Sequence, residues 1–210
     1  NGNQFTTLQG AINAAQEGQT VALLGNIVLD KPVVVSGDKT VTLDLSGCTV
    51  TPGDGYTKSA LVLVEADGSL TIKDSKTGGA VGTAESYTAR GISTKGTLRL
   101  EGGTVCADEI GILASPSAVL EVTGGTVAVT NAESSSGEAI KAQFKSTVKL
   151  SGGTIQGGQS ASGSTMGSAV SALGSSVEIS GNAQLSGYSG VSLYNLRTTE
   201  DGGAVLDNKE

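Results

Sequence analysis

The sequence predicts an all-β fold, a three-sided parallel β-helix of about seven coils. The first observation is the phrase L-x-G-G-T-[V/I], which recurs at 100–105, 122–127 (with Val in place of Leu) and 150–155. A second is spacing, because β-rich segments of similar pattern return every 22 to 29 residues. A third is composition: 32 Gly, only 3 Pro and 3% aromatic residues suit a narrow interior of stacked Val, Leu and Ile.

The N-terminal segment predicts a capping helix over residues 5–16. Thr6 or Thr7 can serve as its N-cap, and Gly18 suits its C-terminal stop. Its apolar residues fall on one face, namely Leu8, Ala11, Ile12 and Ala15. A solenoid has open ends, so we expect residues 1–20 to cap a single β-helix domain over residues 21–210.

Strand patterns then follow without a break at 21–24, 27–29, 32–35 and 40–45. From residue 58 the coils align in three rows. The first row holds Leu61–Val64, Ile92, Ile112, Ile140, Val170 and Val191. The second holds Leu70, Leu98, Leu120, Val148 and Val177, each followed two residues later by another apolar residue. The third holds Val50, Val81, Val105, Val127, Ile155 and Leu185.

The paired glycines follow the second row, where we expect a tight corner that needs positive φ or close backbone approach. Strand alternation then turns the next Thr outward and the next Val or Ile inward. The expected result is an external ladder of Thr49, Thr104, Thr126 and Thr154.

Charge and cysteine content narrow the function classes. The net charge of −7 with 13 scattered basic residues argues against a nucleic-acid partner. No apolar run is long enough for membrane insertion. Cys48 and Cys106 lie about two coils apart, so we expect two separate thiols, and without His they cannot complete a zinc site.

The chain starts at Asn1 without Met, and an exported parent protein is compatible with this start.

Residues 18–24, residues 41–50 and the L-x-G-G-T-[V/I] coils resemble the right-handed β-helix modules of large secreted and surface proteins of Gram-positive bacteria, within the broad pectate-lyase-like class. The resemblance covers nearly the whole chain. It implies a right-handed solenoid, a secreted or cell-surface location and a monomeric module.

Length variation is confined to the connections that follow the third row, at 51–59, 82–90, 128–138 and 156–167. Insertions on one edge of a repeat protein often form its binding surface, although a corner that simply tolerates length gives the same pattern. Tyr56, Tyr87 and Tyr188 fall on this edge, where a ring can stack on a sugar or pack under a loop.

Acidic residues gather on the same edge: Asp54, Glu85, Asp108, Glu109, Glu133 and Glu138. Carboxylates from adjacent coils could hold Ca²⁺, but no EF-hand pattern is present and Asp54 before Gly55 reads as a turn residue. We therefore predict no metal site and no cofactor, with calcium as an open alternative. Tyr87 with Arg90 could form a base and clamp for a uronate.

These observations favour a non-catalytic exported module, a surface adhesin, glycan-contacting unit or structural spacer, with a glycan or a host or cell-surface protein as partner. The candidate binding residues are Tyr56, Asp54, Tyr87, Glu85, Arg90, Asp108 and Glu109.

The alternative is a polysaccharide lyase or glycoside hydrolase, with Glu109 and Glu138 as a possible carboxylate pair. The chain lacks His and galacturonase signatures, and Arg99 points outward with no acidic cluster expected beside it. Ice binding needs T-x-T arrays, and among the aligned third-row strands only residues 49–51 provide one.

Overall fold

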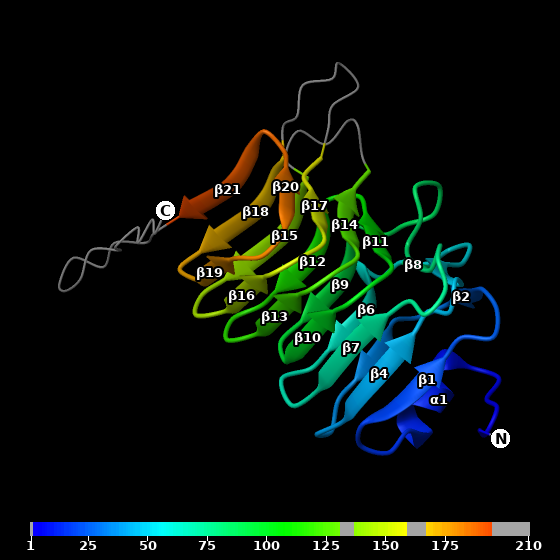
Figure 1. Cartoon of the computed structure of the whole chain (residues 1–210). Coiled ribbons are helices and arrows are strands. Elements are labelled where there is room, and N and C mark those ends of the chain that lie inside the picture. The colour runs from blue at the N-terminus through cyan, green and yellow to red at the C-terminus, as the bar shows by residue number, and fades with distance from the viewer. Residues whose placement is uncertain (1, 131–136, 159–166, 195–210) are drawn as a thin grey trace.

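The computed structural model describes residues 2–130, 137–158 and 167–194. Within them, strands form three parallel seven-stranded sheets, so each turn of the chain adds one strand to each sheet (Figure 1). This confirms the three-sided parallel β-helix of seven coils. Sheet A contains β1 (Gln19–Ala22), β4 (Thr40–Asp44), β7 (Ser69–Lys73), β10 (Thr97–Leu100), β13 (Val119–Val122), β16 (Thr147–Leu150) and β19 (Ser176–Ile179).

The other two sides are built in the same order. Sheet B contains β2 (Ile27–Leu29), β5 (Thr49–Pro52), β8 (Ala80–Val81), β11 (Thr104–Ala107), β14 (Thr126–Val129), β17 (Thr154–Gln156) and β20 (Gln184–Ser186). Sheet C contains β3 (Val33–Val35), β6 (Ala60–Val64), β9 (Arg90–Thr94), β12 (Ile110–Ala114), β15 (Glu138–Gln143), β18 (Ser168–Leu173) and β21 (Ser189–Tyr194).

The strand register confirms all three predicted rows. In sheet A, Leu98 pairs with Leu70 on one side and Leu120 on the other. In sheet B, Val127 pairs with Val105 and Ile155. These inward side chains are fully buried in the middle coils, and they form one continuous apolar column. Burial of this column is the main source of stability in such a fold.

The N-terminal helix α1 (Leu8–Ala14) is shorter than the predicted 5–16. Thr7 is its N-cap, and the Thr7 hydroxyl accepts a hydrogen bond from the Gly10 amide at 3.1 Å. The chain turns extended at Ala15, so Gly18 does not end the helix as expected. Gly18 instead takes its positive φ in the turn that leads into β1.

The helix closes the exposed edge of sheet C through one side chain. The Gln9 amide donates to the Val34 carbonyl at 2.9 Å and accepts from the Val34 amide at 2.7 Å. It thus occupies the hydrogen-bonding positions of a missing neighbouring strand on β3. Leu8 and Ile12 are buried beneath it, which confirms the predicted cap.

The corner between sheets A and B contains the paired glycines. In the three L-x-G-G-T-[V/I] coils the second glycine has positive φ, +80° at Gly103, +78° at Gly125 and +82° at Gly153, whereas at Gly78-Gly79 the first glycine does, with +99°. A Cβ at Gly125 would also lie 2.6 Å from the Gly103 carbonyl oxygen. Both predicted reasons for glycine therefore hold. Any other residue would be strained at positive φ, and its Cβ would collide with the backbone of the preceding coil.

The predicted Thr ladder is only partly correct. Thr104, Thr126 and Thr154 pair in register on sheet B, but Ala80 stands between Thr49 and Thr104. The coil that contributes β8 reads Gly-Gly-Ala-Val instead of Gly-Gly-Thr-Val, so the ladder is broken there. Cys48 and Cys106 are free thiols as predicted, and Cys106 lies within β11.

The described part of the chain contains no helix with the length and apolar character needed to cross a bilayer.

Candidate functional site

The unequal connections all lead from sheet B to sheet C, which places them along one corner of the β-helix (Figure 1). The first, residues 53–59, joins β5 to β6, and the second, residues 82–89, joins β8 to β9. Only residues 108 and 109 separate β11 from β12. Residues 131–136, with the candidate Glu133, and residues 159–166 lie outside the described part of the chain.

An open hollow of about 670 Å³ lies between the first two connections. It brings together four of the seven candidate residues, namely Asp54, Tyr56, Glu85 and Tyr87. Arg90, Asp108 and Glu109 are not among its lining residues.

Tyr56 stabilises its own loop. Its hydroxyl donates a 2.6 Å hydrogen bond to the Ala60 carbonyl, and its ring packs against the apolar column. Burial, together with the nearby Asp30 carboxylate, raises the pKa of Tyr56 to about 12. The Tyr56 phenol therefore stays protonated and holds the 53–59 loop against the core. Only part of its surface is exposed to a ligand.

Tyr87 is half-buried, and Asp54 and Glu85 are exposed at the hollow. A half-exposed ring flanked by carboxylates can stack on a sugar face while the carboxylates accept hydrogen bonds from hydroxyl groups. Tyr188, by contrast, is 75% exposed at the last coil, away from this hollow.

Asp108 and Glu109 form the tight connection beneath the second loop. The Asp108 amide donates to the Thr88 carbonyl at 3.0 Å and the Glu109 amide to the Ala89 carbonyl at 2.9 Å. Among the described residues, Arg90 Nε and Asp108 Oδ1 are buried atoms without a hydrogen-bond partner. Arg90 directly follows the lining residue Ala89 in the chain, but neither Arg90 nor Asp108 lines the hollow.

Cys106 lies in the same corner. Burial, and then the Glu85 carboxylate, raises the pKa of the Cys106 thiol above its ordinary value. The neutral thiol is a poor nucleophile, since reactivity belongs to the thiolate.

The described residues contain no group of three or more Asp, Glu, Cys or His side chains arranged to hold a metal ion. One of the two carboxylates considered for glycoside hydrolysis, that of Glu138, forms an ion pair. Glu109 and Glu138 lie on adjacent coils, where the Glu138 amide donates to the Glu109 carbonyl at 2.8 Å. The Glu138 carboxylate pairs with Lys141 Nζ at 2.8 Å.

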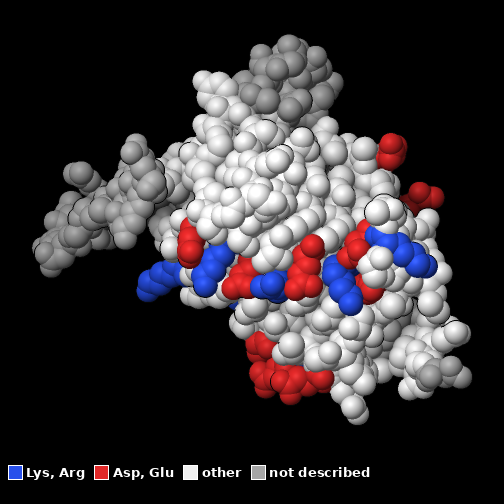
Figure 2. Space-filling view, in the orientation of Figure 1, with Lys and Arg blue, Asp and Glu red and all other residues white. Residues whose placement is uncertain are grey.

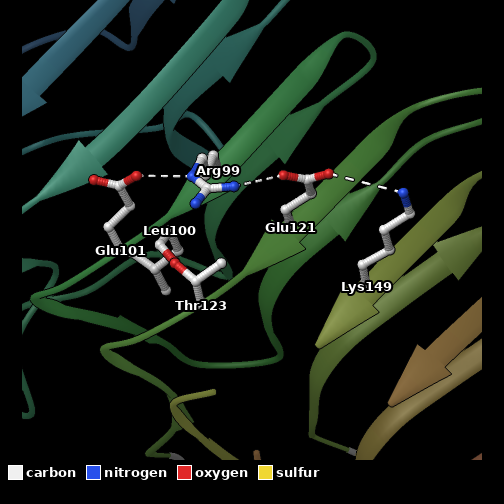
Figure 3. Close-up of polar contacts among 6 residues, drawn as sticks. All are labelled: Arg99, Leu100, Glu101, Glu121, Thr123 and Lys149. Atoms are coloured by element: carbon white, nitrogen blue, oxygen red, sulfur yellow. Dashed lines mark hydrogen bonds and ion pairs between the residues drawn. The ribbon is translucent and has the colours of Figure 1, made fainter. Parts of the chain in front are cut away.

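The expectation that Arg99 has no acidic neighbours is wrong. Arg99 Nε lies 2.7 Å from Glu101, and Arg99 Nη1 lies 2.7 Å from Glu121 on the next coil (Figure 3). Lys149 Nζ continues the row at 4.0 Å from the second oxygen of Glu121. The hydrogen bonds that Arg99 donates to Glu101 and Glu121 raise the pKa of Arg99 further, so the neutral guanidine that a catalytic base requires is even less populated.

This charge ladder, defined by Arg99, Glu121, Lys149 and Glu178, follows one outward position of sheet A. Figure 2 shows the resulting band of alternating positive and negative side chains across one face of the molecule. The signal was present in the sequence, because these residues stand midway between the paired apolar positions of the second row. The signal is visible only when the coils are aligned, because Glu121 lies 22 residues from Arg99 in the sequence.

No protein-family model matches this sequence, and no curated protein or solved structure matches it significantly.

Proposed function

We propose that this chain is a non-catalytic β-helix module of an exported protein, which presents the loop corner between sheets B and C to a surface glycan. The proposal includes a right-handed, pectate-lyase-like solenoid from a Gram-positive cell surface, as the resemblance of the coils implies. Seven coils at about 4.8 Å each make a rod of roughly 35 Å, which suits a unit that holds a contact surface away from its attachment.

The observation that carries the proposal is how the polar groups of the described residues are used. Arg99 is held between two carboxylates, and Glu138 is paired with Lys141. Asp44 and Asp74 accept hydrogen bonds from backbone amides at the corner between sheets A and B. These groups maintain the coils. At the hollow between residues 53–59 and 82–89, the Tyr87 ring lies with the exposed Asp54 and Glu85 carboxylates, which have no such contacts among the described residues.

Tyr87 is the residue that we expect to contact the glycan. Its ring lies at the hollow and, unlike that of Tyr56, is not part of the apolar column. A tyrosine ring offers a flat apolar face on which the apolar face of a sugar can stack. Asp54 and Glu85 then select sugars with hydroxyl groups toward the rim.

A glycan array with the full chain tests this proposal, with and without Ca²⁺. We expect binding of at least one glycan class, at least tenfold weaker in Tyr87→Ala, which corresponds to about 1.4 kcal/mol. Tyr188→Ala is the matched control, because Tyr188 is exposed but lies outside the hollow. Loss that depends on Ca²⁺ removal would reopen the calcium alternative.

Two results contradict the proposal. Cleavage of a uronate-containing polysaccharide by the purified chain would make it an enzyme. If the chain binds no glycan, the hollow is not a contact surface and the module acts as a spacer.

A further inference from the structure

Two sheet edges at the N-terminal end of the β-helix differ in how they are covered. On sheet C, the Gln9 amide lies at the outer edge of β3 and bonds to both backbone groups of Val34. On sheet A, β1 is the first strand and, among the described residues, has a strand neighbour only in β4. A side-chain amide and a peptide group have the same donor and acceptor chemistry, so a peptide backbone on β1 would continue what Gln9 does on β3.

The unpaired backbone groups of β1 follow from one hydrogen bond. The Leu23 amide donates to the Asp44 carbonyl at the end of β4, at 2.9 Å. Successive peptide groups of a strand point to opposite sides within the sheet, so the amides of Thr20 and Ala22 point away from β4. In the described part of the chain, no strand lies on that side. These two amides therefore form an open hydrogen-bonding edge.

An open groove of about 590 Å³ is lined by this edge. Its other walls are the N-terminal segment at residues 2–7, the alanines of α1 and the corner that follows β1. Two of its apolar side chains are exposed to solvent, Phe5 by 46% and Leu24 by 81%. Although 16% of the chain is charged, none of the described residues that line the groove is. The groove therefore favours an uncharged partner with apolar side chains.

We propose that this groove binds an extended, uncharged peptide segment of a partner protein, which adds to β1 as a further strand of sheet A. Its backbone bonds to Thr20 and Ala22, and its side chains contact Phe5 and Leu24. In such strand addition, main-chain hydrogen bonds supply affinity and side-chain contacts supply specificity. A charged segment is disfavoured, because a charge buried without a partner costs free energy. The inference does not depend on the proposed glycan contact, which lies at the corner between sheets B and C.

Amide hydrogen exchange of the full chain, resolved by NMR, tests the strand addition with a defined probe. The probe is the end-capped peptide Gln-Thr-Val-Ala-Leu-Leu, which copies the uncharged residues 19–24. At about ten times its dissociation constant, it should slow exchange at Thr20 and Ala22 by about tenfold. Exchange at Val21 should change little, because its amide already faces β4. A second probe with Lys in place of the threonine should bind about tenfold more weakly or worse.

Two variants separate the edge from the rest of the groove. Ala22→Pro removes an outward donor and no amide that faces β4, a position where an edge strand tolerates proline. It should weaken binding of the uncharged probe by about tenfold, whereas the matched control Ala22→Val keeps the donor at this exposed position and should bind as wild type does. Leu24→Lys places a charge at an exposed position of the groove and should also weaken binding, even if the proline variant does not fold.

The proposal is wrong if the uncharged probe leaves exchange at Thr20 and Ala22 unchanged in the wild-type chain. It is also wrong if these two amides are already protected without the probe. Protection that falls on dilution would then assign the edge to a second copy, and protection independent of dilution would assign it to the chain itself.

Discussion

Single polar residues decide how the chain passes the corner between sheets A and B. The later coils use paired glycines there, but the second and third coils use carboxylates. Asp44 Oδ1 accepts from the amides of Ser46 at 2.9 Å and Ser75 at 3.0 Å. Asp74 accepts from the amides of Gly47 at 2.7 Å and Gly79 at 2.8 Å. Each carboxylate accepts one hydrogen bond from its own coil and one from a neighbouring coil, so it links the two coils at this corner.

Asp44 should therefore give the fold a measurable acid dependence. Its burial opposes ionisation, but hydrogen bonds from Ser75 and Ser46 outweigh burial and lower the pKa of Asp44 below 3.8. A lowered folded pKa contributes stability that is present above the ordinary carboxyl range and is lost as pH falls through the folded value. Asp44→Ala should lose about 1–3 kcal/mol of unfolding free energy at pH 7.

Urea unfolding at pH 7 and at about pH 3 measures this loss. The gap in unfolding free energy between wild type and Asp44→Ala should narrow at the lower pH, because the Asp44 carboxylate of the unfolded chain binds a proton there more readily than that of the folded chain. Asp67→Ala, at an exposed position, is the control and should change stability little at either pH. A gap that is constant with pH would show that Asp44 acts through packing instead of charge.

At the scale of elements, the strands followed from the sequence because one repeated pattern specified each of them. Inward Val, Leu and Ile alternate with outward polar residues, and the coil spacing aligned these positions before any coordinates. The side-chain contacts between coils did not follow as easily. Glu121 lies 22 residues from Arg99 but directly beside it in space, and Tyr56 proved to be a strut because its hydroxyl meets the Ala60 carbonyl four residues on.

The N-terminal cap gives a prediction about an edge strand. Gln9→Ala removes both hydrogen bonds to Val34 and leaves an open edge on β3. We expect a loss of about 1–3 kcal/mol and faster amide exchange at Val34, measured by NMR. Exposed edges also promote association, so light scattering should rise at high protein concentration. Gln16→Ala, an exposed substitution just past the helix, is the control; equal exchange at Val34 in both variants would contradict the clamp.

At the scale of the whole molecule, each coil contacts mainly its two neighbours. The strongest contacts link strands that are adjacent within one sheet, such as β12 with β9 and β15. This arrangement was predictable from the repeat alone. The site was not, because the loops that break the repeat carry no periodic information. In the structure, the connections at 53–59 and 82–89 flank an open hollow, and Arg90, Asp108 and Glu109 are not among its lining residues.

Coil-by-coil contact predicts that stability varies along the rod. Leu120 is fully buried in the fifth of the seven coils, so Leu120→Ala should cost about 2–5 kcal/mol and raise amide exchange on both sides of it. Val177 packs at the last described coil and is only partly buried, so Val177→Ala should cost less and loosen β19 to β21 alone. Hydrogen exchange resolved by coil distinguishes the two patterns. If Val177→Ala raises exchange equally in β4 and β7, the rod unfolds as one cooperative unit, and the nearest-neighbour description of its stability is wrong.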